Sequence, residues 1–233
     1  MNGGPIEVPV TTQSFSRTYA EGPAVRGFWH EPSGSWKDAL VFTHGAGSDC
    51  SSLLVVSIAD EFAAAGIAVL RCDLPYRQRR PRGAPSPSGA AEDREGLRRA
   101  AQAARETASG LVFLGGQSYG GRQATMLAAE DPGVADALLL TSYPLHPPGK
   151  PAQLRTGHFP NLRTPAFFAH GSKDPFGSLE EIKQALTEIP ARRTLLEFDG
   201  GVHGLVQKRD GPKAFREMAV RVQEGFQKFL AQG

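Results

Sequence analysis

The sequence is poor in cysteine, and its two cysteines, Cys50 and Cys72, do not form a CxxC pair. A zinc site or a dithiol redox motif of that kind is therefore not indicated. We expect both cysteines to be small buried thiols. The fold must then come from the pattern of hydrophobic residues, which make up 40% of the chain, rather than from disulfides or a structural metal.

Long apolar runs and an excess of one charge are also missing. No stretch approaches the ~18 apolar residues of a membrane span, and residues 1–12 have neither the basic start nor the apolar run of a signal peptide. Lys and Arg number 26 against 24 Asp and Glu, so the net charge of +2 gives no reason to propose nucleic-acid binding. We expect a cytoplasmic protein of one domain, residues 1–233, with no nucleic-acid or membrane partner.

Short apolar segments alternate with longer segments of helical period. The predicted strands cover residues 39–44, 67–74, 111–114, 137–141, 166–170 and 194–198. The predicted helices cover residues 53–65, 90–108, 122–130, 179–188 and 213–231. Continuous apolar strands separated by helices indicate a mostly parallel central sheet with helices on both faces. Alternating residues in 8–19, followed by 25–30, add an antiparallel hairpin at the edge of the sheet.

Two segments interrupt this rhythm. Residues 76–89 are rich in Pro, Ser, Gly and Arg, a composition that is typical of a mobile loop. Residues 142–164 are rich in proline and too few to form a helical lid. We therefore expect no cap domain.

Residues 116–120 read Gly-Gln-Ser-Tyr-Gly, a G-x-S-x-G motif between a predicted strand and a predicted helix. Such a turn reverses the chain within about one residue and holds the serine in a strained backbone conformation. Glycines at 116 and 120 avoid collisions, and the helix N-terminus directs free N–H groups at the serine oxygen. A dinucleotide-binding loop fits less well, because the glycine spacing differs and no acidic residue ends the next strand. The motif predicts an α/β-hydrolase fold with Ser118 as the nucleophile.

A serine nucleophile needs a base and an acid that orients the base, and in this fold they follow in the order acid, then histidine. His203 lies between glycines after the last predicted strand, so we predict it as the base. Asp174 follows the strand at 166–170 and is the predicted acid. Asp199, before two glycines, and Asp73, at the end of an earlier strand, are the alternatives.

The predicted oxyanion hole combines two backbone N–H groups. One belongs to Tyr119, directly after the nucleophile, and the other to Ala46, with Gly47 as the alternative. His44, beside them, is expected to be a structural hydrogen-bonding residue.

Without a cap, the serine should lie in a shallow, open cleft. Its predicted apolar pocket residues are Tyr143, Leu145, Phe176 and Leu205. If the two irregular segments fold over the strand ends, they form a basic rim that could steer an anionic substrate. The predicted rim residues are Arg77, Arg79, Arg80, Arg82, His146, Lys150 and Arg155. A solvated basic loop is the alternative.

A metal site is the alternative to this interpretation. His44, His170 and His203 each precede a glycine near the predicted end of a strand, and such a cluster could bind a metal ion. No HxH or HxxxH spacing supports it, and it would leave the serine motif unexplained. We predict no metal and no cofactor.

Six segments together suggest a family. The sequence carries HGAGS, RCDLPYR followed by RRP, GGQSYGGR, SYPLHPPGKPAQLR, HGSKDPFG and a late VHG. From about residue 20 onward it resembles bacterial α/β-hydrolases related to dienelactone hydrolases, whose animal relatives include a testis-expressed protein and a subunit of a chromatin acetyltransferase complex. The resemblance implies the α/β-hydrolase fold with Ser118, Asp174 and His203 as a triad. This sequence has Ser where true dienelactone hydrolases have Cys at the nucleophile.

Two functions follow as hypotheses. The first is a serine hydrolase that cleaves small carboxylic esters or related acyl substrates through an acyl-enzyme. The second is a non-catalytic binding or scaffold protein on the same fold, because fold alone does not determine function.

Overall fold

A computed structural model describes residues 10–232 of the chain. They contain one sheet built from the strands β1 Val10–Arg17, β2 Val25–Pro32, β3 Ala39–Thr43, β4 Ala68–Cys72, β5 Val112–Gln117, β6 Ala137–Thr141, β7 Ala166–Gly171 and β8 Arg193–Phe198. The order across this eight-stranded sheet is β1-β2-β4-β3-β5-β6-β7-β8. β2 pairs antiparallel with both β1 and β4, and the remaining neighbours are parallel. The mostly parallel sheet with an antiparallel edge hairpin confirms the sequence prediction, although residues 8–9 of the predicted hairpin lie outside the described residues.

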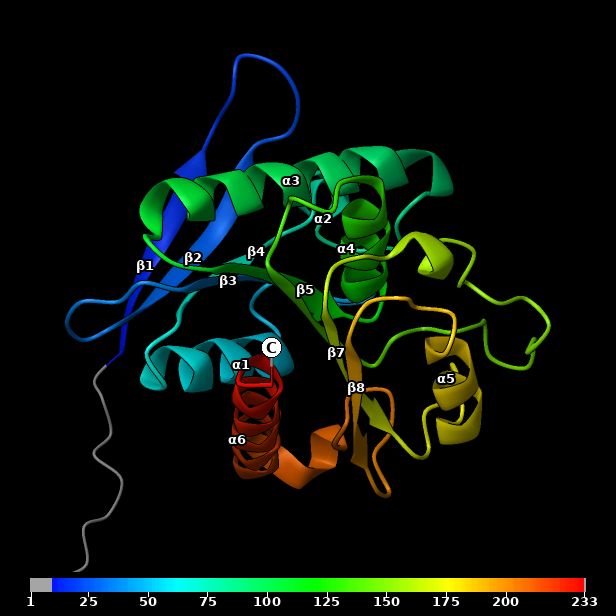
Figure 1. Ribbon diagram of the computed structural model, residues 1–233. Helices are drawn as coiled ribbons and strands as arrows, with labels where there is room; N and C mark the ends of the chain where they lie inside the picture. The colour runs from blue at the N-terminus through cyan, green and yellow to red at the C-terminus, as the bar shows by residue number, and fades with distance from the viewer. Residues whose placement is uncertain (1–9, 233) are drawn as a thin grey trace, which may run out of the picture.

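Helices cover both faces of the sheet (Figure 1). The α-helices are α1 Leu53–Ala64, α2 Pro75–Arg79, α3 Ala90–Thr107, α4 Tyr119–Glu130, α5 Leu179–Leu186 and α6 Gly211–Leu230. Short 3-10 turns occur at η1 Pro87–Gly89, η2 Phe159–Asn161 and η3 Lys208–Asp210. In Figure 1, α3 and α4 lie above the sheet, and α1 and α6 lie below it. None of the helices within residues 10–232 has the length and hydropathy needed to cross a membrane.

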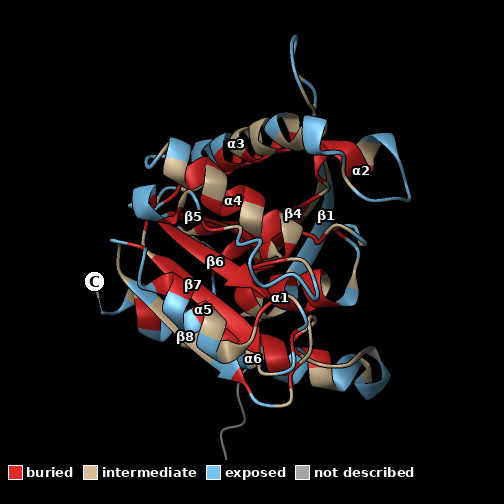
Figure 2. Ribbon diagram, turned by 90° about the vertical axis from the view of Figure 1, so that its right-hand side faces the viewer, coloured by how far each residue is buried: buried red, intermediate tan, exposed pale blue. Residues whose placement is uncertain are grey.

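Two hydrophobic cores form because successive side chains of a strand point to opposite faces of the sheet. On β3, Val41 belongs to the core beneath α3 and α4, whereas Leu40 and Phe42 belong to the core beneath α1 and α6. Burial is continuous along β6 and β7 and nearly so along β5 (Figure 2). This burial on both faces explains why the central strands are unbroken apolar runs rather than alternating ones.

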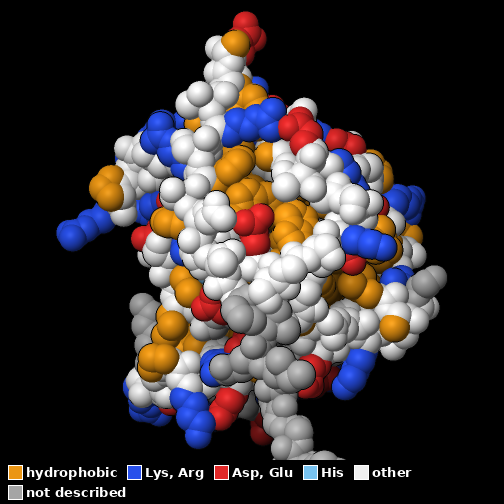
Figure 3. Space-filling model, turned by 90° about the vertical axis from the view of Figure 1, so that its left-hand side faces the viewer, with side chains coloured by type: hydrophobic (Ala, Val, Ile, Leu, Met, Phe, Trp, Pro, Cys, Tyr) orange, Lys and Arg blue, Asp and Glu red, His pale blue; other side chains and the backbone are white. Residues whose placement is uncertain are grey.

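The edge hairpin of β1 and β2 is held by aromatic packing. Phe15 of β1 meets Trp29 of β2 edge-on at 6.1 Å between ring centroids, and Trp29 stacks on Trp36 at 6.0 Å. On this side of the molecule, Lys and Arg side chains are interspersed with Asp and Glu (Figure 3). This face therefore offers no patch of a single charge.

The parallel strands end at a common edge. Thr43 of β3 is in register with Gly116 of β5, and Gln117 is in register with Thr141 of β6. The segments that follow β3, β5, β7 and β8 therefore meet beyond this edge, which is where ligands bind in open α/β sheets. No cap domain covers the edge in the described part of the chain: the segment between β6 and β7 contains only the short turn η2.

The segment at 76–89 was predicted as a mobile loop, and this prediction is wrong for its first residues, whereas residues 80–86 are irregular and mostly exposed. Its first residues form α2, in which Tyr76 is 2% and Arg77 is 7% exposed. The backbone N–H of Tyr76 donates to the buried Asp93 of α3 at 3.0 Å. Arg-rich composition suggested exposure, but Arg77 is buried because backbone carbonyl groups accept its hydrogen bonds.

Candidate active site

Ser118 lies at the turn between β5 and α4, with φ of 50° and ψ of −114°. A positive φ strains a residue other than glycine, and such strain is common at functional sites. The turn is tight because a Cβ atom at Gly120 would lie 2.5 Å from Thr43 Cγ2 and 2.6 Å from the His44 carbonyl oxygen. A Cβ at Gly116 would also lie 2.9 Å from Thr43 Cγ2. Glycine at 116 and 120 therefore lets this turn pack against the end of β3.

His203 comes from the segment after β8, and its ring reaches Ser118. His203 Nε2 lies 2.8 Å from Ser118 Oγ. The ring stacks on Phe176 with 4.1 Å between centroids, and 26% of the His203 side chain is exposed. The imidazole is thus packed against Phe176 and partly exposed to the solvent.

Asp174, after β7, lies on the far side of the same ring. His203 Nδ1 lies 2.8 Å and 3.0 Å from the two carboxylate oxygens, one of which also accepts the backbone N–H of Phe176 at 2.9 Å. The alternative acids have other partners: Asp199 accepts from Ser172, and Asp73 accepts from the backbone N–H of Cys50. The structure therefore brings together the three side chains that the sequence selected as nucleophile, base and acid.

His170 is a further histidine at this site, which sequence reasoning considered only as a metal ligand. Its Nε2 donates to the Gly177 carbonyl at 2.8 Å and lies 3.8 Å from Asp174 Oδ2. Burial lowers the pKa of His170, which keeps the ring neutral. A neutral ring at this distance packs behind the Asp174 carboxylate without a second positive charge competing with His203.

The segment after β3, residues 44–48, lies beside Ser118: a Cβ atom at Gly45 would be 3.4 Å from the Ser118 Cβ. Its shape is set by hydrogen bonds to its carbonyl groups. His44 Nδ1 donates to the Gly45 carbonyl at 2.8 Å while its Nε2 accepts from the Leu74 N–H at 3.2 Å. Burial lowers the pKa of His44, in agreement with this neutral ring and with the structural role expected for it.

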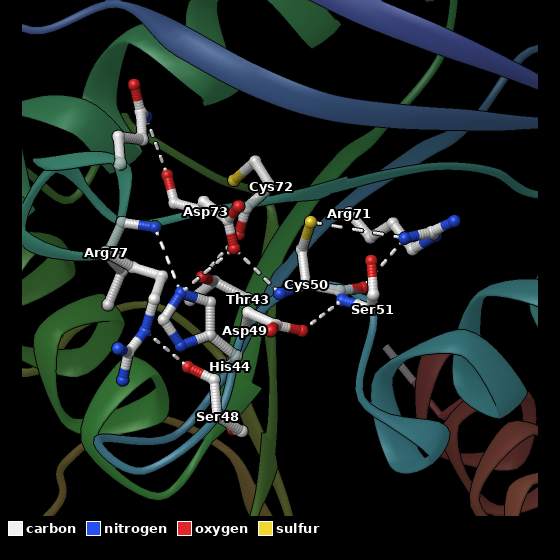
Figure 4. A network of polar contacts seen from close by, with 12 residues as sticks. Thr43, His44, Ser48, Asp49, Cys50, Ser51, Arg71, Cys72, Asp73 and Arg77 are labelled. Carbon is white, nitrogen blue, oxygen red and sulfur yellow. Dashed lines mark hydrogen bonds and ion pairs between the residues drawn. The ribbon is translucent and has the colours of Figure 1, made fainter. Parts of the chain in front are cut away.

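Two residues of α2, Arg77 and Tyr76, complete this network, and the sequence did not reveal their role; Figure 4 shows Arg77 beside His44 and Ser48. Arg77 donates to the carbonyl groups of Ser48 at 2.8 Å and Ala46 at 3.0 Å. The Tyr76 hydroxyl donates to the carbonyl groups of Gly45 at 3.2 Å and Ala46 at 3.0 Å. These bonds turn the carbonyl groups of the segment toward α2.

The cysteines beside this network are the buried thiols that the sequence predicted. Cys50 is 2% and Cys72 is 3% exposed, and both are free. Burial raises the pKa of the Cys50 thiol to about 12. Because the thiolate is the reactive form, Cys50 is a poor nucleophile compared with a serine that has a base at hydrogen-bonding distance.

Ser118 and His203 open into a cavity of about 1400 Å³ that Tyr119, Ala46 and Phe176 also line. This volume exceeds the roughly 300–1000 Å³ of common ligand pockets. The cavity wall is mostly apolar, and its larger apolar side chains from α1, α6 and the segment after β8 are Leu53, Leu54, Phe215, Val202 and Val206. The sequence predicted these helices but gave no sign that their ends face the cavity.

Three of the four predicted pocket residues do not line this cavity, and only Phe176 does. Tyr143 is 1% exposed, packs against Phe159 and Phe168, and donates its hydroxyl to the Arg155 carbonyl. Leu145 and Leu205 are 0% and 1% exposed and belong to the two cores. These three residues were predicted from their closeness in sequence to the site motifs. The prediction was wrong because the chain after each strand turns back into the core before it reaches the cavity.

The predicted basic rim does not form as a unit. Arg155 lines the cavity, but Arg77 and His146 are buried at 7% and 5% exposure. Arg79 pairs with Glu92 of α3. The remaining rim residues, Arg80, Arg82 and Lys150, are exposed.

The metal alternative finds no support in the histidine contacts. His203 faces Ser118 and Asp174, and the other two histidines donate to backbone carbonyl groups. Within residues 10–232, no three His, Cys, Asp or Glu side chains are grouped so that they could hold a metal ion.

Comparison with known proteins agrees with this fold. The chain belongs to the α/β-hydrolase family, since the family described as "Alpha/beta hydrolase domain" matches residues 36–231. A dienelactone hydrolase from Anabaena variabilis is 22% identical with a TM-score of 0.73, covering 94% of this chain and 98% of that one. The predicted relation to dienelactone hydrolases is thereby confirmed at the level of the fold.

Two further solved structures share the fold. An α/β serine hydrolase without lid from Xanthomonas campestris is 16% identical with a TM-score of 0.68, covering 95% of this chain and 96% of that one. The esterase domain of a Rhodothermus marinus protein is 16% identical with a TM-score of 0.62, covering 93% of this chain and 98% of that one.

Proposed function

We propose that the protein is a serine hydrolase that cleaves small carboxylic esters or related acyl compounds through an acyl-enzyme on Ser118. The observation that carries this proposal is the continuous line of hydrogen-bonding contacts from Ser118 Oγ through His203 to the Asp174 carboxylate. Membership in the α/β-hydrolase family independently supports a hydrolytic activity.

In this mechanism, each nitrogen of His203 has its own role. Because a carboxylate only accepts hydrogen bonds, Nδ1 carries the proton toward Asp174, and Nε2 is left to accept the proton of Ser118. As Ser118 Oγ attacks the substrate carbonyl carbon, its proton passes to Nε2, and Asp174 stabilises the resulting imidazolium.

The acyl-enzyme then forms and breaks in two proton-balanced steps. The tetrahedral intermediate expels the alcohol, which takes the proton from His203 Nε2, and the acyl group remains on Ser118. Water attacks the acyl carbon while His203 Nε2 takes a water proton. Collapse of the second intermediate releases the acid and returns that proton to Ser118 Oγ. No cofactor takes part in these steps.

The oxyanion is assigned to the backbone N–H groups of Tyr119 and Ala46, with Gly47 as the alternative second donor. Tyr119 is the first residue of α4, so its N–H has no partner within the helix. The N–H groups of Ala46 and Gly47 have no acceptor among the described residues, and the carbonyl groups of Gly45, Ala46 and Ser48 are drawn toward α2. Donors fixed in this way need no reorganisation as negative charge develops.

The test is hydrolysis of short-chain 4-nitrophenyl esters by the full chain. Ser118→Ala should lower kcat/KM by roughly 10⁴- to 10⁶-fold, as expected for loss of a nucleophile. Ser86→Ala is the matched control, because Ser86 also lines the cavity but hydrogen-bonds only to Ser88 through its hydroxyl. Equal hydrolysis by Ser118→Ala and the wild type would contradict the proposal, and no hydrolysis by either would favour a binding or scaffold function.

A further inference from the structure

The charged residues of the cavity are all of one sign. Arg122, Arg155 and Lys173 line it, and its described wall contains neither Asp nor Glu. The whole chain is nearly balanced, with 26 basic and 24 acidic residues. The positive lining is therefore a local property of the cavity and does not follow from composition.

Arg122 stands one helical turn after Ser118 on α4 and has no counter-ion. Its buried Nε atom has no hydrogen-bond partner, and no carboxylate in the described part of the chain pairs with it. The arginines of the adjacent α3 differ: Arg94 pairs with Glu130 at 3.1 Å, and Arg98 pairs with Asp131. Carboxylates at the end of α4 thus neutralise the α3 arginines and leave Arg122 unpaired.

Arg155 reaches the same cavity from the segment between β6 and β7. Its guanidinium makes one long hydrogen bond, from Nη1 to the Pro144 carbonyl at 3.4 Å. Burial lowers the pKa of Arg155, and the nearby positive charge of Arg122 lowers it further. Two like charges thus lie close together beside the candidate nucleophile.

His158 is a further group near Arg122. It contacts Thr125 of α4 at 2.8 Å. Burial lowers the pKa of His158 to about 4, and the charges of Arg122 and Arg94 lower it further. Arg122 thus contributes to the lowered pKa values of both Arg155 and His158.

Partly buried guanidinium groups without a counter-ion are costly, and an anion that they bind together removes that cost. We propose that Arg122 and Arg155 form an anion subsite that binds a carboxylate or phosphate group of the substrate. This inference rests on the proposed function and narrows its substrate class to esters that carry an oxyanion group near the scissile bond.

Ser118, Arg122 and Arg155 line the same cavity, and Arg122 follows Ser118 by about one helical turn. A substrate that reaches both the nucleophile and the arginines therefore carries its anion close to the scissile carbonyl, as in the half-ester of a short dicarboxylic acid. A planar guanidinium donates two parallel hydrogen bonds to a carboxylate or a phosphate, so two of them favour an oxyanion over a neutral polar group.

The kinetic test compares mono-4-nitrophenyl glutarate with its neutral twin, the mixed methyl 4-nitrophenyl ester. The wild type should prefer the anionic ester. Arg122→Met and Arg155→Met should each lower that preference, the ratio of the two kcat/KM values, by about 10- to 100-fold, as expected for losing a hydrogen bond to a charged group. Arg163→Met is the matched control, because Arg163 is exposed and lies outside the cavity wall. Arg122→Lys keeps the positive charge but cannot donate two parallel hydrogen bonds, so it should recover part of the preference for the anionic ester.

A binding test separates failure of the subsite from failure of the hydrolase. Glutarate and a short alkyl phosphate are titrated calorimetrically into Ser118→Ala, which keeps both arginines but has no nucleophile. The subsite is supported if either ligand binds to Ser118→Ala and the further substitution Arg155→Met abolishes this binding. The ligand that binds more tightly identifies the anion. Absence of binding together with equal turnover of both esters would overturn the subsite and leave the hydrolase standing. Binding without any turnover would overturn the hydrolase alone.

Discussion

The two ring nitrogens of His203 face different partners, and this difference organises the site at the scale of single residues. Nδ1 faces the fully buried carboxylate of Asp174, and Nε2 faces the serine hydroxyl. Phe176 contributes twice, by stacking on the ring and by donating its N–H to Asp174. The orientation of the imidazole therefore depends on a small group of contacts around Asp174.

Asp174→Asn should lower kcat/KM for an ester by about 10³- to 10⁴-fold, because an amide NH₂ turned toward Nδ1 favours the tautomer that cannot accept the serine proton. Asp199→Asn is the control, since Asp199 accepts a hydrogen bond from Ser172 and does not contact His203. Steady-state hydrolysis with circular dichroism of both variants checks the prediction. Comparable rates in the two variants would show that Asp174 is not the acid.

Stability should depend on His158 as the pH falls. In the unfolded chain a histidine titrates near 6.5, whereas the folded chain holds the pKa of His158 at about 4. Between these values the unfolded chain binds more protons, so the free energy of unfolding falls as the pH falls through this window. Urea denaturation at about pH 7 and about pH 5 should show a smaller loss for His158→Gln than for the wild type. His44 and His170, whose pKa values burial also lowers, account for loss that remains in the variant. Equal losses in the variant and the wild type would contradict this prediction.

Among single residues, the sequence correctly selected the side chains whose positions a motif determines. It did not predict correctly the pocket residues, whose directions depend on packing. Ser118, Asp174 and His203 follow strand ends in a set order, and their side chains lie together in the structure. Tyr143 and Leu205 also follow strand ends, but the turn after each strand directs them into the cores. Spacing along the chain cannot distinguish these directions, because they depend on contacts between distant segments.

At the scale of elements, the short helix α2 acts as a support for the segment at 44–48. Arg77 reaches two carbonyl groups of that segment and two more in its own neighbourhood, those of Arg80 and Gly83. It thereby ties the candidate oxyanion donors to the loop that follows α2.

Arg77→Met should lower kcat by about 10- to 100-fold, the range expected when catalytic groups are displaced slightly. Its stem would still pack, but the carbonyl groups of Ala46 and Ser48 would lose a donor. Arg79→Met, on the same helix, is the control because Arg79 pairs with Glu92 on the surface. The readout is kcat separated from KM on a neutral ester. An unchanged kcat in a folded Arg77→Met variant would show that α2 does not position this segment.

Elements with strong periodicity were predictable, and short ones were not. The central strands appear in the sequence as apolar runs because both of their faces are buried. The helix α4 begins at Tyr119, before the predicted start at residue 122, because two glycines in its first turn hide the helical pattern. α2 has only five residues, too few for any period to show, and its burial comes from contacts with α3 and the segment at 44–48.

At the scale of the whole molecule, the sheet gathers segments that are far apart in the sequence. The contact between His203 and Ser118 spans 85 positions, and parallel register places the ends of β5, β7 and β8 at one edge. The sequence predicted this layout. It also predicted a basic rim that included Arg155, but it did not predict that Arg122 and Lys173 would line the cavity.

Labelling with a fluorophosphonate probe, followed by peptide mass spectrometry, tests the central claim most directly, because the probe reacts covalently with an activated serine whatever the natural substrate is. We expect modification at Ser118 in the wild type and in Ser86→Ala, and its loss in Ser118→Ala. A folded wild-type protein in which Ser118 stays unmodified would contradict the claim that His203 and Asp174 activate this serine.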